Sequence, residues 1–225
     1  MGRKGYAPTM ESASSLPRIS ADSRRALVVQ ALRRAIETGE FQPGDRLVER
    51  DLSAQMNISR GPLREAMIQL EQEGLITTYP YRGTVVAEIS AEEVEKVLVP
   101  IRLTLERFAV GHALQRLTDA DLAELQGQIG AMRQAAAAGD VTGVVETDMR
   151  FHEILLERAE QPQCLQIWRT IAPRVRAYFH RDAYRHGELA NVAHGHDALL
   201  EALRRRDPAE VDAILQAHIN ETLDL

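Results

Sequence analysis

Cysteine is nearly absent from this sequence, since Cys164 is the only one among 225 residues. A single cysteine cannot close a disulfide within the chain, so a disulfide-stapled scaffold is excluded. Long apolar runs are missing too, because no stretch approaches the ~20 residues that a membrane-spanning helix needs. Residues 1–20 also lack the apolar segment of a secretory signal peptide. We therefore expect a cytoplasmic protein with no membrane partner.

Lysine is scarce as well: only Lys4 and Lys96 occur, and the other 25 of the 27 basic residues are arginine. Arginine makes bidentate contacts with phosphate, carboxylate and guanine. An arginine-rich genome would give the same count, so the positions of the arginines must decide. Aromatic residues make up 4% of the chain, against 44% hydrophobic and 27% charged residues. This composition excludes collagen-like and wholly disordered chains, and the length allows one large or two modest domains.

The net charge of −6 argues at first against a nucleic-acid partner, because a phosphate-binding surface must be positive. The charge is unevenly spread, however. Residues 1–88 contain 12 Lys and Arg against 11 Asp and Glu, whereas residues 89–225 contain 15 against 22. The acidity therefore belongs to the C-terminal part, and the N-terminal part is close to neutral.

The apolar spacing and the turn residues predict a mainly α-helical chain. Residues 1–20 are expected to form a mobile tail. Residues 21–88 predict three helices and then two β-prone runs joined by a turn, and Ser59 is expected to accept a backbone N–H at the start of the third helix. Three helices followed by a hairpin are typical of a winged helix-turn-helix domain, which binds DNA.

Beyond Ser90, which we expect to cap the next helix, only helical periods occur. They cover residues 91–115, 119–137, 141–160, 163–181, 188–206 and 208–223. Short connections between them predict an antiparallel bundle of six or seven helices over residues 91–225.

Three arginines lie where a helix-turn-helix would contact DNA. Arg60 and Arg64 are four residues apart at the start of the third helix and share one face, and Arg50 on the preceding helix can reach a flanking phosphate. An arginine can hold O6 and N7 of guanine at once, which contributes about 1–3 kcal/mol of discrimination. These arginines could also do no more than solvate a helix surface, but their place at the reading end of the motif favours DNA contact.

The same region resembles the DNA-binding domain of the GntR family of bacterial transcription regulators. The resemblance covers roughly residues 24–88 and rests on Ile36–Gly39, Pro43–Leu47, Glu49–Ser53, Ile58–Arg60, Pro62–Ala66, Leu70–Leu75 and Gly83–Val86. It implies that Arg50, Arg60 and Arg64 contact DNA, that Ser59 contacts a phosphate or base, and that Gly83 is the wing-tip glycine in the minor groove. Gly61 departs from the Thr that many members carry.

The C-terminal part contains a candidate metal site. Asp148 and His152 are four residues apart on one helix and can chelate one ion, and His196 and His218 follow on later helices within apolar surroundings. Three imidazoles and a carboxylate suit a divalent transition metal such as Zn²⁺ or Ni²⁺ and leave positions for water or a ligand carboxylate. Taken singly, each histidine is better explained by an ordinary structural or surface role than by metal binding.

The four residues also carry a second resemblance, over about residues 91–220, to the metal-containing FCD ligand-binding domain of the FadR subfamily. The resemblance implies that Asp148, His152, His196 and His218 are its metal ligands, and six helices would favour the VanR-like branch. It further implies a small organic acid as effector, with Arg102 as its cationic partner. Arg174 is a weaker second candidate, and a surface or structural ion pair explains either arginine equally well.

These patterns predict a dimeric transcription regulator, a repressor, whose operator binding responds to a small carboxylate. The alternative is a metal-dependent hydrolase-like enzyme fused to a DNA-binding module. That enzyme needs a base beside the metal, and Glu153, next to His152 in sequence, is rotated off the required face. A purely architectural DNA-binding protein is a third interpretation, but it leaves the metal ligands without a purpose.

Overall fold

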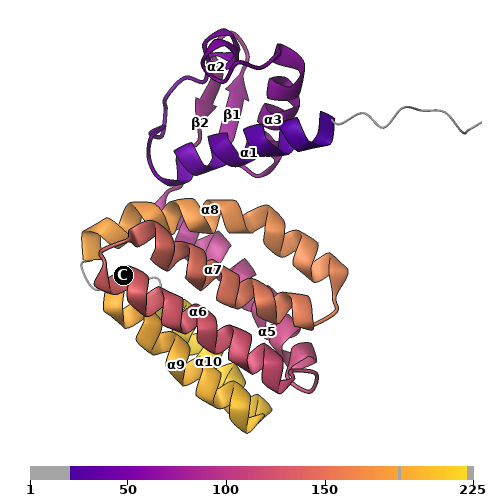
Figure 1. The fold of residues 1–225 in the computed structure, drawn as a ribbon, viewed down its shortest axis with the longest axis vertical. Coiled ribbons are helices and arrows are strands. Elements are labelled where there is room, and N and C mark those ends of the chain that lie inside the picture. Colours follow the sequence, from indigo (N-terminus) through magenta and orange to yellow (C-terminus); the bar gives the residue numbers. More distant parts are fainter. Residues whose placement is uncertain (1–20, 187–188, 222–225) are drawn as a thin grey trace, which may run out of the picture.

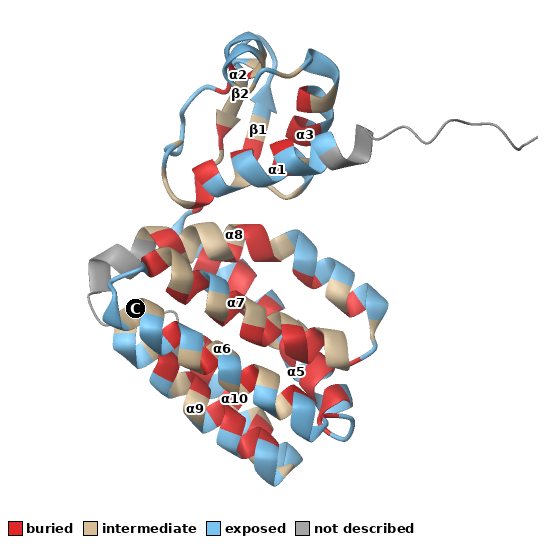
Figure 2. Cartoon of the chain, viewed as in Figure 1, coloured by how far each residue is buried: buried red, intermediate tan, exposed pale blue. Residues whose placement is uncertain are grey.

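The computed structural model describes residues 21–186 and 189–221 and folds them into two parts (Figure 1). The N-terminal part is the smaller and contains both strands of the described chain, and the C-terminal part is helical. Each part has its own hydrophobic core, seen in Figure 2 as buried positions on the inward faces of its helices. The mainly helical fold with a winged helix-turn-helix at its N-terminal end is confirmed.

The N-terminal part consists of α1 (Ala21–Glu37), α2 (Glu49–Gln55) and α3 (Arg60–Gln72), followed by β1 (Ile76–Tyr79) and β2 (Gly83–Val86). Helix α3 turns Leu63, Ala66 and Leu70 inward, and all three are fully buried against α1 and β1. The strands pair antiparallel, from Ile76 opposite Val86 to Tyr79 opposite Gly83. Because β2 leads back to the helical part, the turn between the strands lies at the far end of the molecule, close to α2 (Figure 1).

The C-terminal part begins with one irregular helix. Its segments are α4 (Ala91–Glu93), the π-helical turn η1 (Val94–Leu98) and α5 (Val99–Ala113). Ser90 caps it as predicted, because its hydroxyl accepts a hydrogen bond from the backbone N–H of Glu93 at 3.1 Å. Pro100 has no N–H to donate to the preceding turn, which explains the wider turn just before α5.

Five further helices complete the bundle: α6 (Asp119–Ala137), α7 (Val141–Arg158), α8 (Pro162–His186), α9 (Leu189–Arg205) and α10 (Pro208–Glu221). Helix α7 packs against α5, α6, α8 and α9 and is therefore the central helix. Helix α8 packs against α7 on one side and against α1 of the N-terminal part on the other (Figure 1). It is the main helical contact between the two parts.

Among the described residues, no helix has both the length and the apolar character that crossing a lipid bilayer would require.

Candidate functional site

Four side chains that could hold a metal ion meet within the helical part. Asp148 and His152 come from α7, His196 from α9 and His218 from α10. Their ligand atoms all lie within 4.8 Å of one another, and all four residues are buried. The predicted set is thus brought together from three helices.

The separations within this cluster match those around a bound transition metal. Nε2 of His152 lies 3.1 Å from Nε2 of His218 and 3.9 Å from Oδ1 of Asp148. Nε2 of His196 lies 3.2 Å from the same Oδ1 atom. Tetrahedral ligands with bonds of about 2.0–2.1 Å lie about 3.3 Å apart. The four atoms therefore need little movement to hold one ion.

Hydrogen bonds outside the cluster fix the histidine rings for metal binding. Nδ1 of His196 lies 2.7 Å from the carbonyl oxygen of Val192, which can only accept, so this nitrogen carries the proton and donates it. Nδ1 of His152 donates to Oε2 of Glu106 at 2.5 Å in the same way. Both rings therefore turn an unprotonated Nε2 inward. Lone pairs gathered around a carboxylate repel one another unless a cation lies between them, so these residues fit a metal ion.

Burial and charge give the cluster the protonation states that metal binding needs. Burial lowers the pKa of His152 and of His218, which keeps both rings neutral at physiological pH. Burial acts to raise the pKa of Asp148, but the neighbouring His196, His152 and Arg102 outweigh it and hold the pKa well below its usual range. Asp148 therefore presents a carboxylate.

Arg102 on α5 lies beside this cluster with part of its hydrogen-bonding capacity free. Its side chain is fully buried, and Nε donates to Oε1 of Glu106 at 2.7 Å. Nη1 and Nη2 are buried without a hydrogen-bond partner. The guanidinium carbon lies 5.7 Å from the ring centre of Trp168 and 5.4 Å from that of Phe179, both on α8. A buried guanidinium with two free donor groups is suited to a carboxylate.

Glu106 belongs to the candidate site by its contacts, although the sequence did not single it out. One of its carboxylate oxygens accepts from His152 and the other from Arg102, so it joins the metal cluster to the free guanidinium. Burial acts to raise its pKa, but the charge of Arg102 and the hydrogen bonds from His152 and Arg102 lower it overall. The sequence does contain a signal for the pairing of Glu106 with Arg102, because the two residues are four apart within an otherwise apolar helix.

The structure does not bring Arg174 to the metal cluster, and its assignment to the effector is corrected. Its guanidinium donates to the main-chain oxygen of Gly74 and to the carboxylate of Glu93. Arg176, two residues further along α8, donates to Glu37 at 3.3 Å. Arg174 therefore connects α8 to the end of α3 and to α4, and Arg176 connects α8 to α1.

The predicted DNA-contacting side chains lie together on α2 and α3. Arg50, Arg60 and Arg64 are exposed. Nε of Arg64 contacts Glu49 at 2.8 Å and Nε of Arg50 contacts Asp51 at 2.9 Å, whereas the described chain gives Arg60 no ion-pair partner. Exposed pairs of this kind are weak and can exchange for phosphate.

Ser59 occupies the N-cap position of α3, but its hydroxyl makes no capping hydrogen bond, contrary to expectation. The backbone approach to α3 is extended, with ψ of 158° at Ser59. The hydroxyl is left available at the exposed start of the helix. Gly83, the predicted wing-tip glycine, has φ of 80° and is the first residue of β2, while residues 80–82 form the tip itself.

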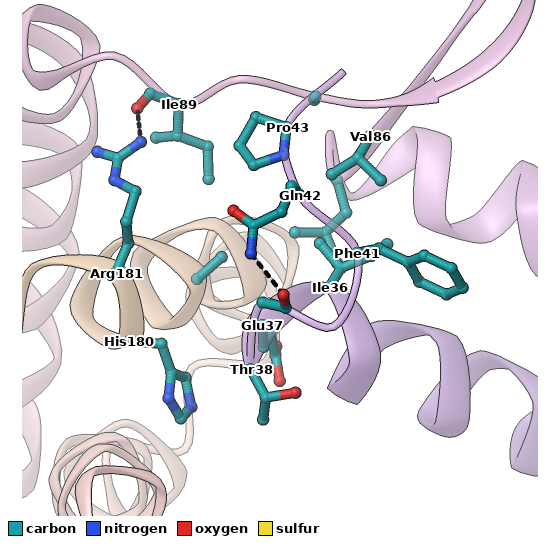
Figure 3. Close-up of a pocket in the computed structure, with 14 residues that line it drawn as sticks. Ile36, Glu37, Thr38, Phe41, Gln42, Pro43, Val86, Ile89, His180 and Arg181 are labelled. Carbon is teal, nitrogen blue, oxygen red and sulfur yellow. Dashed lines mark hydrogen bonds between the residues drawn. The ribbon is translucent and has the colours of Figure 1, made fainter. Parts of the chain in front are cut away.

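A cavity of about 220 Å³ lies where the two parts meet (Figure 3). Ile36 and Phe41 of the N-terminal part form apolar walls, and His180 and Arg181 approach from α8. Glu37 also lines it, and burial raises the pKa of this carboxyl to about 7 against the opposing effect of Arg176. The cavity therefore lies between the two parts and is separate from the metal cluster.

Comparisons with known proteins agree with both halves of this arrangement. Residues 25–86 match the family model described as bacterial regulatory proteins, gntR family, and residues 97–221 match the FCD domain, which covers more than half of the chain. The chain belongs to the GntR family. Its combination of a GntR helix-turn-helix with an FCD domain is the FadR-subfamily architecture.

Several named transcriptional regulators are similar to this chain over most of their length. The Nta operon transcriptional regulator of Aminobacter aminovorans is 32% identical over 82% of this chain and 85% of that protein. The HTH-type transcriptional repressor RspR of Escherichia coli K12 is 30% identical over 86% of this chain and 85% of that protein. The solved structure of E. coli McbR/YncC superposes with a TM-score of 0.79 at 25% identity and covers 89% of this chain and 95% of that one. These relatives are transcriptional regulators, so the enzyme alternative is set aside.

Proposed function

We propose that this GntR-family protein is a dimeric repressor whose operator binding responds to a small organic acid at a metal site in its FCD domain. The observation that carries the proposal is the four-ligand cluster beside the free guanidinium of Arg102. A bacterial operator lies in the cytoplasm, and we expect the protein to act there.

On the DNA side, we propose that Arg60 and Arg64 read bases in the major groove and that Arg50 and Ser59 contact the flanking backbone. The exposure of all three arginines and the free hydroxyl of Ser59 support these roles. Gly83 brings the backbone of the wing close to the minor groove, where a side chain would obstruct approach. The acidic FCD domain helps to keep the rest of the protein away from phosphate.

In the FCD domain, Asp148, His152, His196 and His218 would hold one divalent ion, with Zn²⁺ or Ni²⁺ the best match to nitrogen and oxygen ligands. When bound, this ion supplies an open position for a carboxylate oxygen. Glu106 holds His152 in the ring orientation that such binding requires.

The charge of the site favours an anionic effector. Arg102 contributes one positive charge, and Glu106 and Asp148 contribute one negative charge each, so the site with neutral histidines has a net charge of −1. A divalent ion reverses this to +1, and one carboxylate then neutralises it. Nη1 and Nη2 of Arg102 are the free donors that such a carboxylate needs.

Helix α8 provides the physical link from this site to the DNA-binding domain. Trp168 and Phe179 on α8 flank Arg102, and Arg174 and Arg176 on the same helix contact Gly74 and Glu37. An acid that binds Arg102 changes what these two rings pack against. We propose that α8 passes this change to the DNA-binding domain.

A dimer is supported by an exposed apolar face on η1, α5 and α8. Val97, Ile101 and Phe108 are spaced along one stripe and are 45%, 37% and 48% exposed, and Ile167 on α8 is 49% exposed. Cys164 on α8 contacts the main chain of Leu105, so the two helices are neighbours. A second copy of the chain would cover this face and give the two-fold arrangement that paired half-sites require.

The proposal is tested with a DNA duplex selected from a random-sequence library by the unaltered protein. Arg60→Ala and Arg64→Ala should each weaken binding by about 1–3 kcal/mol, measured by fluorescence anisotropy. Arg133→Ala is the matched control, because Arg133 only pairs with Asp197 on the surface of the helical domain. Binding that is intact in both α3 variants would overturn the proposed reading helix.

The sensor half is tested on the same duplex with metal-loaded protein and acetate, malate and citrate as probes. At least one of these acids should release the DNA, and release should disappear after chelation or in His152→Ala and His196→Ala. Elemental analysis should show that both variants have lost the metal. Full metal retention in both would overturn the ligand assignment.

A further inference from the structure

The cavity between the two parts is lined by a buried histidine whose hydrogen-bonding groups are unused. His180 on α8 is only 5% exposed, and its side chain lines the cavity (Figure 3). Within residues 21–186 and 189–221, neither of its ring nitrogens has a hydrogen-bond partner. Buried polar groups are hydrogen-bonded in the great majority of cases. We propose that this cavity is a second small-molecule site, separate from the metal cluster, and that it takes a neutral single-ring compound with a hydroxyl or ring N–H group, such as a phenol.

A second buried polar group lines the same cavity. Glu37, the last residue of α1, is 9% exposed, and its Oε1 accepts a hydrogen bond from Arg176 at 3.3 Å. Its Oε2 accepts none from the part of the chain that the structure describes. Because burial raises the pKa of Glu37 to about 7, the carboxyl is protonated in about half of the molecules at neutral pH and can then donate as well as accept. A ligand therefore meets unused hydrogen-bonding groups on both sides of the domain junction.

The remaining walls of the cavity are mostly apolar. Ile36 and Val86 of the DNA-binding domain and Ile89 after it are buried, and Ala177 of α8 packs against both hydrophobic cores. Water finds few polar partners along such walls, whereas an aromatic ring buries apolar surface there. A cavity of about 150 Å³ is large enough for benzene. The volume of about 220 Å³ therefore accommodates one ring with a small substituent.

The charges around the cavity favour a neutral ligand. Burial lowers the pKa of His180 to about 4, so at neutral pH the ring is uncharged, with one nitrogen that donates and one that accepts. An ammonium group would be repelled by Arg176 and Arg34, whose charges already act on His180. A carboxylate would be repelled by ionised Glu37, and Nη1 of Arg181, which also lines the cavity, already donates to a main-chain oxygen. A hydroxyl group matches the neutral imidazole without either cost.

The first test asks whether His180 supplies the specificity. It uses the full chain without metal or DNA, so its failure would leave the proposed regulation untouched. Phenol and toluene are of similar size and differ in the hydroxyl group. Titrations followed by the methyl NMR signals of Ile36, Val86 and Ile89 should show phenol binding about 2- to 12-fold more tightly, the net effect of one hydrogen bond. His180→Leu should make the two affinities equal, whereas the control His194→Leu, at an exposed position on α9, should keep the difference.

The second test locates the ligand and its class. Ala177→Phe places a ring in the cavity and should abolish the binding of both compounds, and its thermal unfolding checks that the variant folds. Benzoate should bind the unaltered protein more weakly than phenol. The inference is overturned if the unaltered protein prefers benzoate or binds phenol no more tightly than toluene, or if the preference for phenol survives in His180→Leu. Unchanged binding in a folded Ala177→Phe protein would place the ligand elsewhere and overturn it too. If Ala177→Phe does not fold, His180→Leu still decides.

Discussion

The guanidinium of Arg174 on α8 donates a hydrogen bond to the main-chain oxygen of Gly74, the residue that follows α3 by two positions. The contact joins the end of α3 to the helical domain over 100 positions of sequence. Gly74 has φ of 69°, and a Cβ there would lie 2.7 Å from Nη1 of Arg174. Both the turn and the contact therefore need glycine.

Gly74→Ala should destabilise the protein more than Gly44→Ala does. Gly44 has φ of 90°, but no atom lies within 4 Å of where its Cβ would be, so its substitution costs only the backbone strain of about 1–2 kcal/mol. Gly74→Ala adds the collision with Arg174. The excess should disappear in the Arg174→Ala background, and equal thermal midpoints for the two single variants would contradict the contact.

Glu106→Gln should weaken metal binding about 10- to 100-fold, the usual effect of losing the group that orients a ligating histidine. Calorimetric titration of the demetallated protein with Zn²⁺ measures this. Glu153→Gln is the control, because Glu153 is adjacent to His152 in sequence but pairs with Arg169 at the surface. A Glu106→Gln protein that binds Zn²⁺ as tightly as the control would show that His152 needs no such support.

Glu37→Gln should change the pH dependence of stability. The pKa of Glu37 is raised from 4.5 to about 7, so the folded state binds the proton more tightly than the unfolded state. The contribution of Glu37 to stability is therefore fully present below pH 4.5 and is lost as the pH rises through 7. The variant, which is neutral throughout, should be more stable at pH 8 by on the order of 2–3 kcal/mol and show little gain at pH 5. Denaturant unfolding at the two pH values provides the measurement, and an equal gain at both would contradict the assignment.

Phe108→Asp should dissociate the proposed dimer, because it puts a charge on the exposed apolar face, where Phe108 is 48% exposed. Sedimentation velocity should show a monomer that retains its metal and its helical circular dichroism. Leu27→Asp is the control, since Leu27 is 64% exposed on α1 and lies outside that face. A Phe108→Asp protein that sediments like the control would place the dimer contact elsewhere.

The helices of this fold could be predicted from the sequence because their apolar residues recur at helical spacing between clear breaks. The pairing of Asp148 with His152 could also be predicted, since residues four apart lie about one helical turn from each other. The role of Glu106 could not, because it lies 46 residues from His152 and only tertiary packing brings them together.

Arg174 and Tyr81 show two other limits of the sequence. On an amphipathic helix that packs on two sides, spacing does not say which neighbour an arginine meets, and Arg174 meets Gly74 rather than the metal cluster. The turn before Gly83 could be predicted from Pro80 and Gly83. The sequence does not say which residue of this turn adopts a positive φ. The strand register pairs Tyr79 with Gly83, which places Tyr81 at that position of the turn.

The four proposed metal ligands follow one another along α7, α9 and α10, and His218 comes last. Synthesis proceeds from the N-terminus, and domains generally fold as they emerge. The DNA-binding domain has all of its elements by Val86, long before His218 is made. The elements of the DNA-binding domain are therefore complete on the growing chain well before the last residue of the proposed metal site has been made.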